Sequence, residues 1–99
     1  MTPDQALQLL QDSRKKIDEI DAKLVELFNQ RAGVVEDVAS AKRTLNKQVD
    51  DPDRREQVLA HARAQNTGPL SNEELTSIFE RIIDKMSDHQ VARLNSGRS

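Results

Sequence analysis

The sequence predicts an all-α protein with three helices per chain and a long first helix. Residues that favour helix over strand, chiefly Ala, Leu, Glu, Gln, Lys and Arg, dominate the 99 positions. Apolar residues recur at helical spacing over most of the chain, and no proline falls inside the first periodic segment. Phe28 and Phe79 are the only aromatic residues, and no segment has the pattern of a strand.

The first helix is expected from about Asp4 to about Leu45. Its apolar residues follow a spacing of four and three: Leu10, Ile17, Leu24, Phe28, Val35, Val38, Leu45. Gly33 interrupts it at a cost of about 1 kcal/mol relative to alanine. At about 1.5 Å per residue the helix would be about 60 Å long. A chain this small cannot cover such a helix alone, so we expect a homodimer.

Two shorter helices are expected after a turn at residues 46–51. Asp51 is a good N-cap, Pro52 suits the first helical position, and the second helix should run to about Asn66. The run Thr67-Gly68-Pro69 should end this second helix.

The third helix should begin with a capping box formed by Ser71 and Glu74. Its apolar face should carry Leu75, Ile78, Phe79, Ile82, Ile83 and Met86, and the helix should extend beyond Gln90. We expect one domain over residues 1–94 and a flexible tail over residues 95–99.

Charge and composition exclude several classes of function. The formal net charge of −2 indicates neither a basic surface for nucleic acid nor a polybasic patch for a membrane surface. Cysteine is absent, and His61 and His89, both expected on the surface, belong to no ligand cluster. Neither a secretion signal nor a run of eighteen apolar residues is present. We expect a cytoplasmic protein that needs no metal and no cofactor.

Three cations share the seam of the long helix. Continuing the spacing of four and three places Arg14, Arg31 and Lys42 in it, together with Asp21. One basic residue there would be explained by a side chain that reaches water from the edge of the stripe, but three point to a ligand. Arg31 and Lys42 are about 16 Å apart on one face, so their side chains can converge on one small anion.

Arg14 lies about 25 Å before Arg31, too far to share that ligand within one helix. It must therefore come from another chain if it takes part. Antiparallel pairing of two long helices, crossing near Phe28, would bring Arg14 of one chain close to Lys42 of the other and create two equivalent sites.

A second charged cluster opens the second helix, where free backbone N–H groups favour anions. Asp51 can be explained as a cap, and Arg55 or Glu56 as solvated charge, but Asp51 and Arg55 are also candidate substrate-binding residues. Arg54 shares a face with Val58 one turn later, which makes it the better ligand candidate.

These positions together resemble the all-helical class of chorismate mutases over nearly the whole chain. The matching residues are Arg14-x-x-Ile17-x-x-Ile20-Asp21-x-Lys23-Leu24, Arg31, Lys42, Asp51-Pro52-x-Arg54, Gly68-Pro69, Ile78-Phe79-x-x-Ile82-Ile83 and Gln90. The resemblance implies an intertwined homodimer of three-helix chains. It also implies an isomerase that converts chorismate to prephenate in aromatic amino acid biosynthesis, by a Claisen rearrangement without a cofactor.

The resemblance implies a role for each site residue. Arg14 of the partner chain would bind one carboxylate of chorismate and Arg31 the other. Lys42 and Gln90 would donate hydrogen bonds to the ether oxygen, and Arg54 would add positive charge beside the substrate. Negative charge grows on that oxygen as the bond breaks, so preorganised donors stabilise the transition state more than the ground state.

Two positions depart from the family pattern. Many members have glutamate directly after the second-helix arginine, contacting the ring hydroxyl, whereas this chain has Arg55 followed by Glu56. Asp51 would help to accept that hydroxyl or would hold the loop. Either Asp51 takes over from the glutamate, or the affinity is altered. Met86 replaces a small or hydroxyl residue and is either a substrate contact or part of the core, as its phase with Ile82 favours.

Two alternatives remain open at the level of sequence. An isochorismate–pyruvate lyase shares the fold and the cationic pocket and also lacks the glutamate; the Asp51-Pro52-x-Arg54 run and the Gly68-Pro69 connection favour the mutase. The other alternative is a noncatalytic regulatory dimer that docks on another shikimate-pathway enzyme. A purely structural seam would not need its cations, which are costly unless paired.

Overall fold

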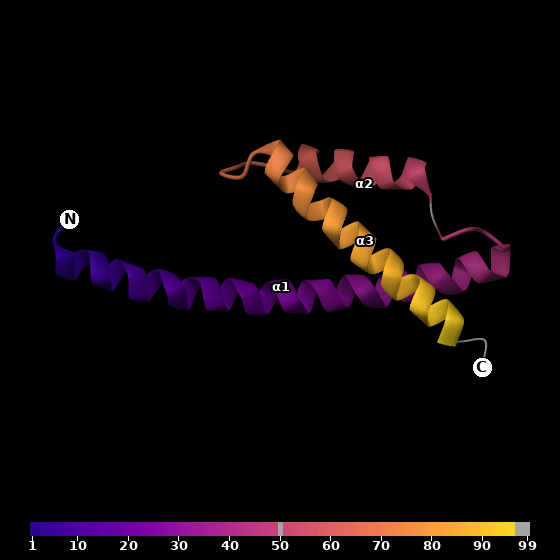
Figure 1. Ribbon diagram of the computed structural model, residues 1–99, viewed down its shortest axis with the longest axis horizontal. Helices are drawn as coiled ribbons and strands as arrows, with labels where there is room; N and C mark the ends of the chain where they lie inside the picture. Colours follow the sequence, from indigo (N-terminus) through magenta and orange to yellow (C-terminus); the bar gives the residue numbers. More distant parts are fainter. Residues whose placement is uncertain (50, 97–99) are drawn as a thin grey trace. The chain divides into compact units, whose positions relative to one another are not determined.

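The computed structural model contains three α-helices, α1 (Pro3–Leu45), α2 (Pro52–Ala64) and α3 (Asn72–Ser96), in that order (Figure 1). The structure describes residues 1–49 and 51–96, and this part of the chain contains no strand. The predicted all-α class and the long first helix are confirmed. Within the same residues, no helix is long and apolar enough to cross a membrane.

Helix α1 begins with a capping box that the sequence prediction missed. The Thr2 hydroxyl accepts the Gln5 backbone N–H at 3.1 Å, and the Gln5 side chain accepts the Thr2 N–H at 2.9 Å. Two of the free N–H groups at the helix start are thereby satisfied. The helix consequently begins at Pro3, one residue before the predicted start.

The end of α1 is set by Asn46, which adopts a left-handed conformation with φ of 56°. Asparagine tolerates this conformation better than most residues do. The Lys47 N–H then donates to the Lys42 carbonyl at 2.8 Å, which satisfies an acceptor of the last turn. The connection therefore starts where the sequence placed it.

The chain divides into two compact units, Met1–Gly33 and Val34–Ser99. The first unit is the N-terminal part of α1, and most of its side chains are exposed. The exposed apolar residues include Leu10, Ile17, Leu24 and Phe28 of the predicted seam. The apolar face of this part of α1 is therefore exposed to solvent and is not buried against another element of the chain.

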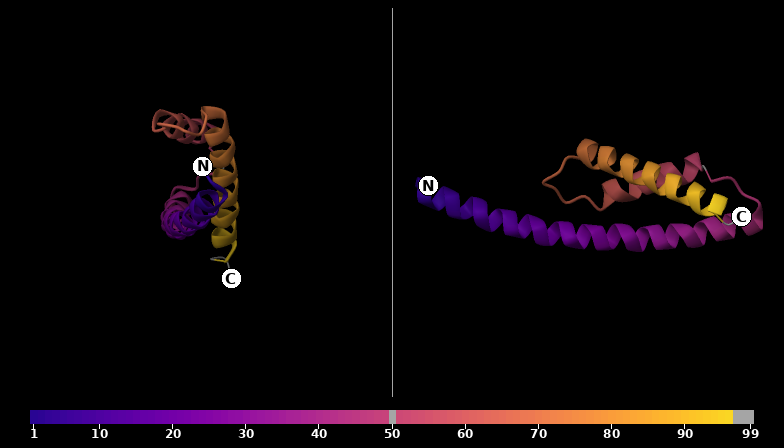
Figure 2. Two further views of the ribbon diagram at one scale, coloured as in Figure 1. Left: turned by 90° about the vertical axis from the view of Figure 1, so that its left-hand side faces the viewer. Right: turned by 60° about the horizontal axis from the view of Figure 1, so that its bottom comes forward.

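The second unit contains the C-terminal part of α1 together with α2 and α3. Helices α2 and α3 pack against each other, and the chain reverses direction between them (Figure 2). Ala39, Leu59 and Ala62 are the buried apolar residues of the part described. The third helix contributes a buried polar residue, Gln90, instead.

The caps of α2 and α3 agree with the sequence prediction. Asp51 accepts the Arg54 N–H at 3.1 Å. The Ser71 hydroxyl accepts the Glu74 N–H at 3.1 Å, and the Glu74 carboxylate accepts the Ser71 N–H at 3.0 Å. The backbone hydrogen bond from Ser71, followed by the bond to its side chain, lowers the pKa of Glu74.

Helix α2 ends at Ala64, two residues before the predicted end, because Asn66 organises the connection to α3. Its side-chain NH₂ donates to the Leu70 carbonyl at 3.0 Å and to the Asn72 side chain at 2.7 Å. Its side-chain oxygen accepts the Gly68 N–H at 3.0 Å. An asparagine with these partners serves the turn better than it would serve a helix.

The division into a domain over residues 1–94 and a tail over residues 95–99 stays a prediction. Helix α3 continues to Ser96, so it includes the first two residues of the expected tail. The remaining residues, 97–99, lie outside those that the structure describes.

Candidate active site

The predicted site residues fall in both compact units. Arg14 and Arg31 lie on α1 in the first unit, where Arg14 is exposed and Arg31 is half-buried. Six further residues lie in the second unit: Lys42, Asp51, Arg54, Arg55, Met86 and Gln90. These six residues therefore lie within one compact body.

Lys42 is placed at the end of α1 with its ammonium directed to the following connection. The residue is half-buried, and its Nζ donates to the Val49 carbonyl at 2.7 Å. An ammonium group carries three donors, so this bond leaves two for an oxygen of a ligand. Lys42 thus both holds the connection to α1 and retains the capacity to stabilise a developing negative charge.

Gln90 is the one buried polar residue among those whose burial the structure describes, with 5% of its surface exposed. Its Nε2 donates to the Val35 carbonyl on α1 over 3.5 Å, which is long for such a bond. Burying an amide is unfavourable unless it is well hydrogen-bonded. The structure therefore shows a buried amide with capacity for a further partner.

The two arginines predicted at the start of α2 have different surroundings. Arg54 is exposed, and its Nη1 donates to the Gln57 side chain at 3.3 Å on the same helix. Arg55 is half-buried and pairs with Asp84 on α3 at 2.8 Å. Because these two side chains are 37% and 53% exposed, the pair is worth at most about 1 kcal/mol. It nevertheless assigns Arg55 a structural contact between α2 and α3.

Met86 lies on α3 one turn before Gln90 and is half-buried, as are Ile82 and Phe79 in the same phase. Its burial fits the apolar face of the helix. The substrate contact suggested for Met86 stays a prediction.

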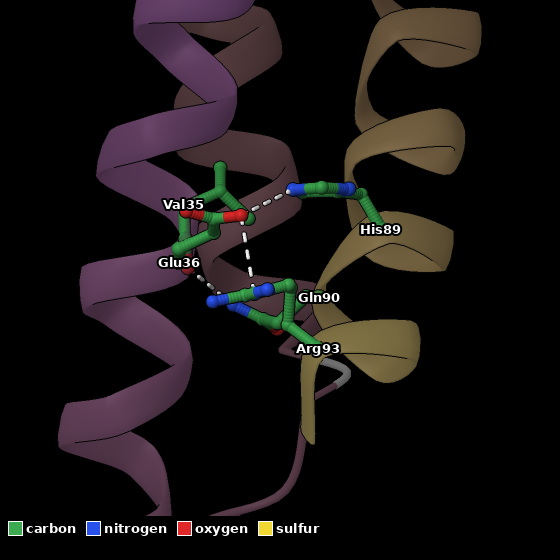
Figure 3. A network of polar contacts seen from close by, with 5 residues as sticks. All are labelled: Val35, Glu36, His89, Gln90 and Arg93. Atoms are coloured by element: carbon green, nitrogen blue, oxygen red, sulfur yellow. Dashed lines mark hydrogen bonds and ion pairs between the residues drawn. The ribbon is translucent and has the colours of Figure 1, made fainter. Parts of the chain in front are cut away.

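A polar network beside Gln90 was missed by sequence reasoning (Figure 3). The Glu36 carboxylate on α1 lies 3.0 Å from His89 Nε2 and forms an ion pair with Arg93, whose Nε is 3.2 Å away. His89, expected on the surface, is half-buried. The spacing of His89 and Arg93 places them on one helix face. No local sequence signal predicts that this face meets Glu36, which lies 53 positions before His89.

Within the part of the chain that the structure describes, no group of three or more His, Asp or Glu side chains could hold a metal ion. The residues placed above are chiefly cationic and amide donors, which suit negative charge on a ligand.

Comparisons with known proteins identify the family of this chain. The family model for chorismate mutase type II matches residues 13–91, a range that includes every predicted site residue from Arg14 to Gln90. The solved structure of a chorismate mutase (form II) from Thermus thermophilus superimposes with a TM-score of 0.79 and 27% identity. That alignment covers 82% of this chain and 92% of the other.

Two curated relatives match over shorter ranges. The bifunctional chorismate mutase/prephenate dehydratase of Pseudomonas aeruginosa is 40% identical over 75 residues, which are 71% of this chain and 20% of that protein. The chorismate mutase of Methanocaldococcus jannaschii is 37% identical over 57 residues, 58% of each chain. The chain thus spans about a fifth of the length of the bifunctional relatives. Because the family model matches well over half of its residues, the chain belongs to the chorismate mutase type II family.

Proposed function

We propose that this protein is an isomerase that converts chorismate to prephenate. The observation that carries the proposal is the pair of donors in the second unit, Lys42 on α1 and the buried Gln90 on α3. Both lie in the matched range of the family, and both keep hydrogen-bonding capacity beyond their present partners.

The reaction needs charge stabilisation and orientation. In the Claisen rearrangement the carbon–oxygen bond of the enol-pyruvyl ether breaks while a carbon–carbon bond forms within the same molecule. Negative charge grows on the ether oxygen, and in our proposal the Lys42 ammonium and the Gln90 amide donate to it. A 10⁶-fold acceleration requires about 8 kcal/mol, and one preorganised donor supplies about 3–4 kcal/mol in comparable sites.

The substrate's two carboxylates require further cations. We assign one carboxylate to Arg31 and the other to Arg14 of a second chain, with Arg54 adding positive charge beside them. Holding both carboxylates would fix the flexible enol-pyruvyl arm in its reactive chair, which converts binding energy into orientation. The reaction is intramolecular and transfers no proton, so the residues need only bind, orient and stabilise charge.

The proposed assembly is an intertwined homodimer. It is supported by the apolar stripe that Leu10, Ile17, Leu24 and Phe28 expose in the first unit. It is supported equally by Arg14, which has no role in a single chain but acquires one beside the Lys42 of a partner. A second protein partner is proposed from the bifunctional relatives, in which a chorismate mutase is joined to a prephenate dehydratase. An enzyme that consumes prephenate is therefore the proposed partner of this chain, and we expect both proteins in the cytoplasm.

The test is a chorismate-disappearance assay on the purified protein, with identification of the product. Prephenate formation is expected in the wild-type protein and should fall by about 10²–10³-fold in Lys42→Met, which removes one charged donor. Lys47→Met is the matched control, because Lys47 is an exposed lysine in the adjoining connection. Full activity in Lys42→Met, or no turnover of chorismate by the wild-type protein, would overturn the proposal.

The isochorismate–pyruvate lyase is the second candidate, favoured by one observation. Arg55, at the position where many family members have glutamate, is paired with Asp84 and supplies no carboxylate to a ring hydroxyl. The same assay run with isochorismate, with pyruvate as the measured product, separates the two functions. Pyruvate release exceeding prephenate formation would favour the lyase.

A further inference from the structure

Glu36 joins α1 to the segment of α3 that carries Gln90. One carboxylate oxygen, Oε1, forms an ion pair with Arg93, whose Nε is 3.2 Å away, and lies 3.0 Å from His89 Nε2 (Figure 3). The Glu36 side chain is 36% exposed, less than those of His89 and Arg93. One carboxylate oxygen of Glu36 thus contacts two side-chain nitrogens of the facing helix.

The two donors bracket Gln90 on α3. His89 directly precedes it, and Arg93 follows three residues later, which places Arg93 beside Gln90 on the helix surface. On the other side of the contact, Val35, whose carbonyl accepts Gln90 Nε2, directly precedes Glu36. Two consecutive residues of α1 therefore contact α3 at the level of the Gln90 amide.

The hydrogen bond of Gln90 is too weak to fix its orientation. Its 3.5 Å length is at the limit for such a bond, and a buried glutamine loses rotamer freedom when it adopts one conformation. The direction of the amide must then depend on how α3 is seated against α1. The two Glu36 contacts, a hydrogen-bond contact with His89 at 3.0 Å and an ion pair with Arg93 at 3.2 Å, are both shorter, so together they hold that position more closely than the single long bond of the amide does.

We propose that Glu36 is a positioning residue for Gln90: it fixes α3 against α1 through His89 and Arg93 and so directs the Gln90 amide. The inference rests on the proposed function, in which that amide donates to the ether oxygen of chorismate. Glu36 itself does not touch the substrate. A separate contact, from Arg43 Nη2 to the Leu94 carbonyl at 2.7 Å, also joins the two helices, so α3 is expected to stay docked when Glu36 is replaced.

The kinetic test compares Glu36→Ala with Glu36→Gln. The alanine variant should lose about tenfold in kcat with KM within about twofold of wild type, because a misdirected donor affects the transition state first. Glu36→Gln keeps an Oε1 acceptor and should stay within about threefold of wild type. Glu56→Ala is the matched control, since it removes an exposed carboxylate that pairs with Arg63 on α2.

A double substitution tests whether Glu36 acts through Gln90. In a Gln90→Ala background, Glu36→Ala should cause no further loss of kcat, because no amide remains to be positioned. An equal fall of kcat in both backgrounds would overturn the proposal, and so would a Glu36→Ala variant with a lower Tm and an unchanged kcat.

A second readout does not depend on activity. The side-chain amide resonances of Gln90, identified by their loss in Gln90→Ala, should shift in the ligand-free Glu36→Ala protein and exchange with solvent at least about tenfold faster. Unchanged resonances would overturn the positioning role. If the wild-type protein does not turn over chorismate, the proposed function fails, whereas this measurement still decides whether Glu36 positions Gln90.

Discussion

Two inactive variants, Arg14→Ala and Lys42→Met, should restore activity when their chains are refolded together. Each proposed site takes Arg14 from one chain and Lys42 from its partner. In a mixed dimer, one site would carry both substitutions and the other would carry neither. Neither chain alone could form an intact site, so recovery of activity would locate Arg14 and Lys42 on different chains of the same site.

The expected magnitude follows from counting sites. Random pairing of equal amounts gives about half mixed dimers, and each has one intact site of two, so about a quarter of the wild-type activity should return. Each variant alone should retain about 1% or less, because each lacks a charged group that stabilises the transition state or binds a carboxylate. The recovered activity would therefore exceed the background by well over tenfold.

The energetics of pairing decide how the experiment must be done. Ile17, Leu24 and Phe28 remain 54%, 42% and 40% exposed in the single chain. Full burial of such a side chain is worth about 1.5–3 kcal/mol, so covering what remains should yield about 0.7–1.5 kcal/mol for each. Six such side chains from two chains contribute about 4–9 kcal/mol before the entropy of association. Subunits held this way exchange slowly, so the variants should be mixed in urea and then diluted.

The assay is the rate of chorismate disappearance after dilution, with the oligomeric state measured by sedimentation and the mixed dimer quantified by mass. Leu24→Asp placed in both chains is the control, because a carboxylate in the apolar seam should prevent pairing and abolish the recovery. Mixed dimers that show no more activity than the two variants assayed separately would refute the shared site. An active monomer would refute it equally.

Three further predictions concern stability. Gly33→Ala should raise the free energy of unfolding by about 0.5–1 kcal/mol in urea titrations, since nothing beyond the adjoining residues and backbone of its own helix lies within 4 Å of the added Cβ; a loss would instead indicate that a partner chain occupies this space. Asn66→Ala should lower it by about 1–2 kcal/mol by removing the turn's side-chain hydrogen bonds, and an unchanged urea midpoint would contradict that role. Because Ser71 lowers the pKa of Glu74, the ionised carboxylate stabilises the fold above its ordinary pKa, and this gain is lost as the pH falls through the lowered value. Glu74→Ala should therefore reduce Tm more at pH 7 than at pH 3, and an equal reduction at both would count against the capping role.

The helices could be predicted from sequence because their ends are set by local chemistry. Asp51 and the Ser71–Glu74 pair lie within three residues of the N–H groups that they cap. The errors are also local, and they occurred where a polar side chain had two plausible uses. Asn66 could have extended α2, but its three side-chain hydrogen bonds, all within six residues, belong to the turn.

The site could be predicted only as a set of residues, because its contacts join positions far apart in the chain. Gln90 reaches a carbonyl 55 residues earlier, and Arg55 pairs with an acid 29 residues later. No periodicity encodes such pairings. The burial of Gln90 depends on how α3 lies against α1. The pattern of apolar residues on α3 alone does not predict that burial. Glu36 was missed for the same reason, since on its own helix it is one charged residue among many.

The departure from the family pattern at Arg55 bears on the proposed contact with the ring hydroxyl of chorismate. The arginine occupies a position where many family members supply a carboxylate, and Asp84 neutralises it from α3. In the proposed site the acceptor for a ring hydroxyl would then come from elsewhere, and Asp51 is nearby in sequence but already caps α2. A carboxylate has about four lone-pair sites, and the bond to the Arg54 N–H uses one of them. The cap and the substrate contact are therefore compatible, so Asp51 can serve the helix and the hydroxyl at once without the missing glutamate.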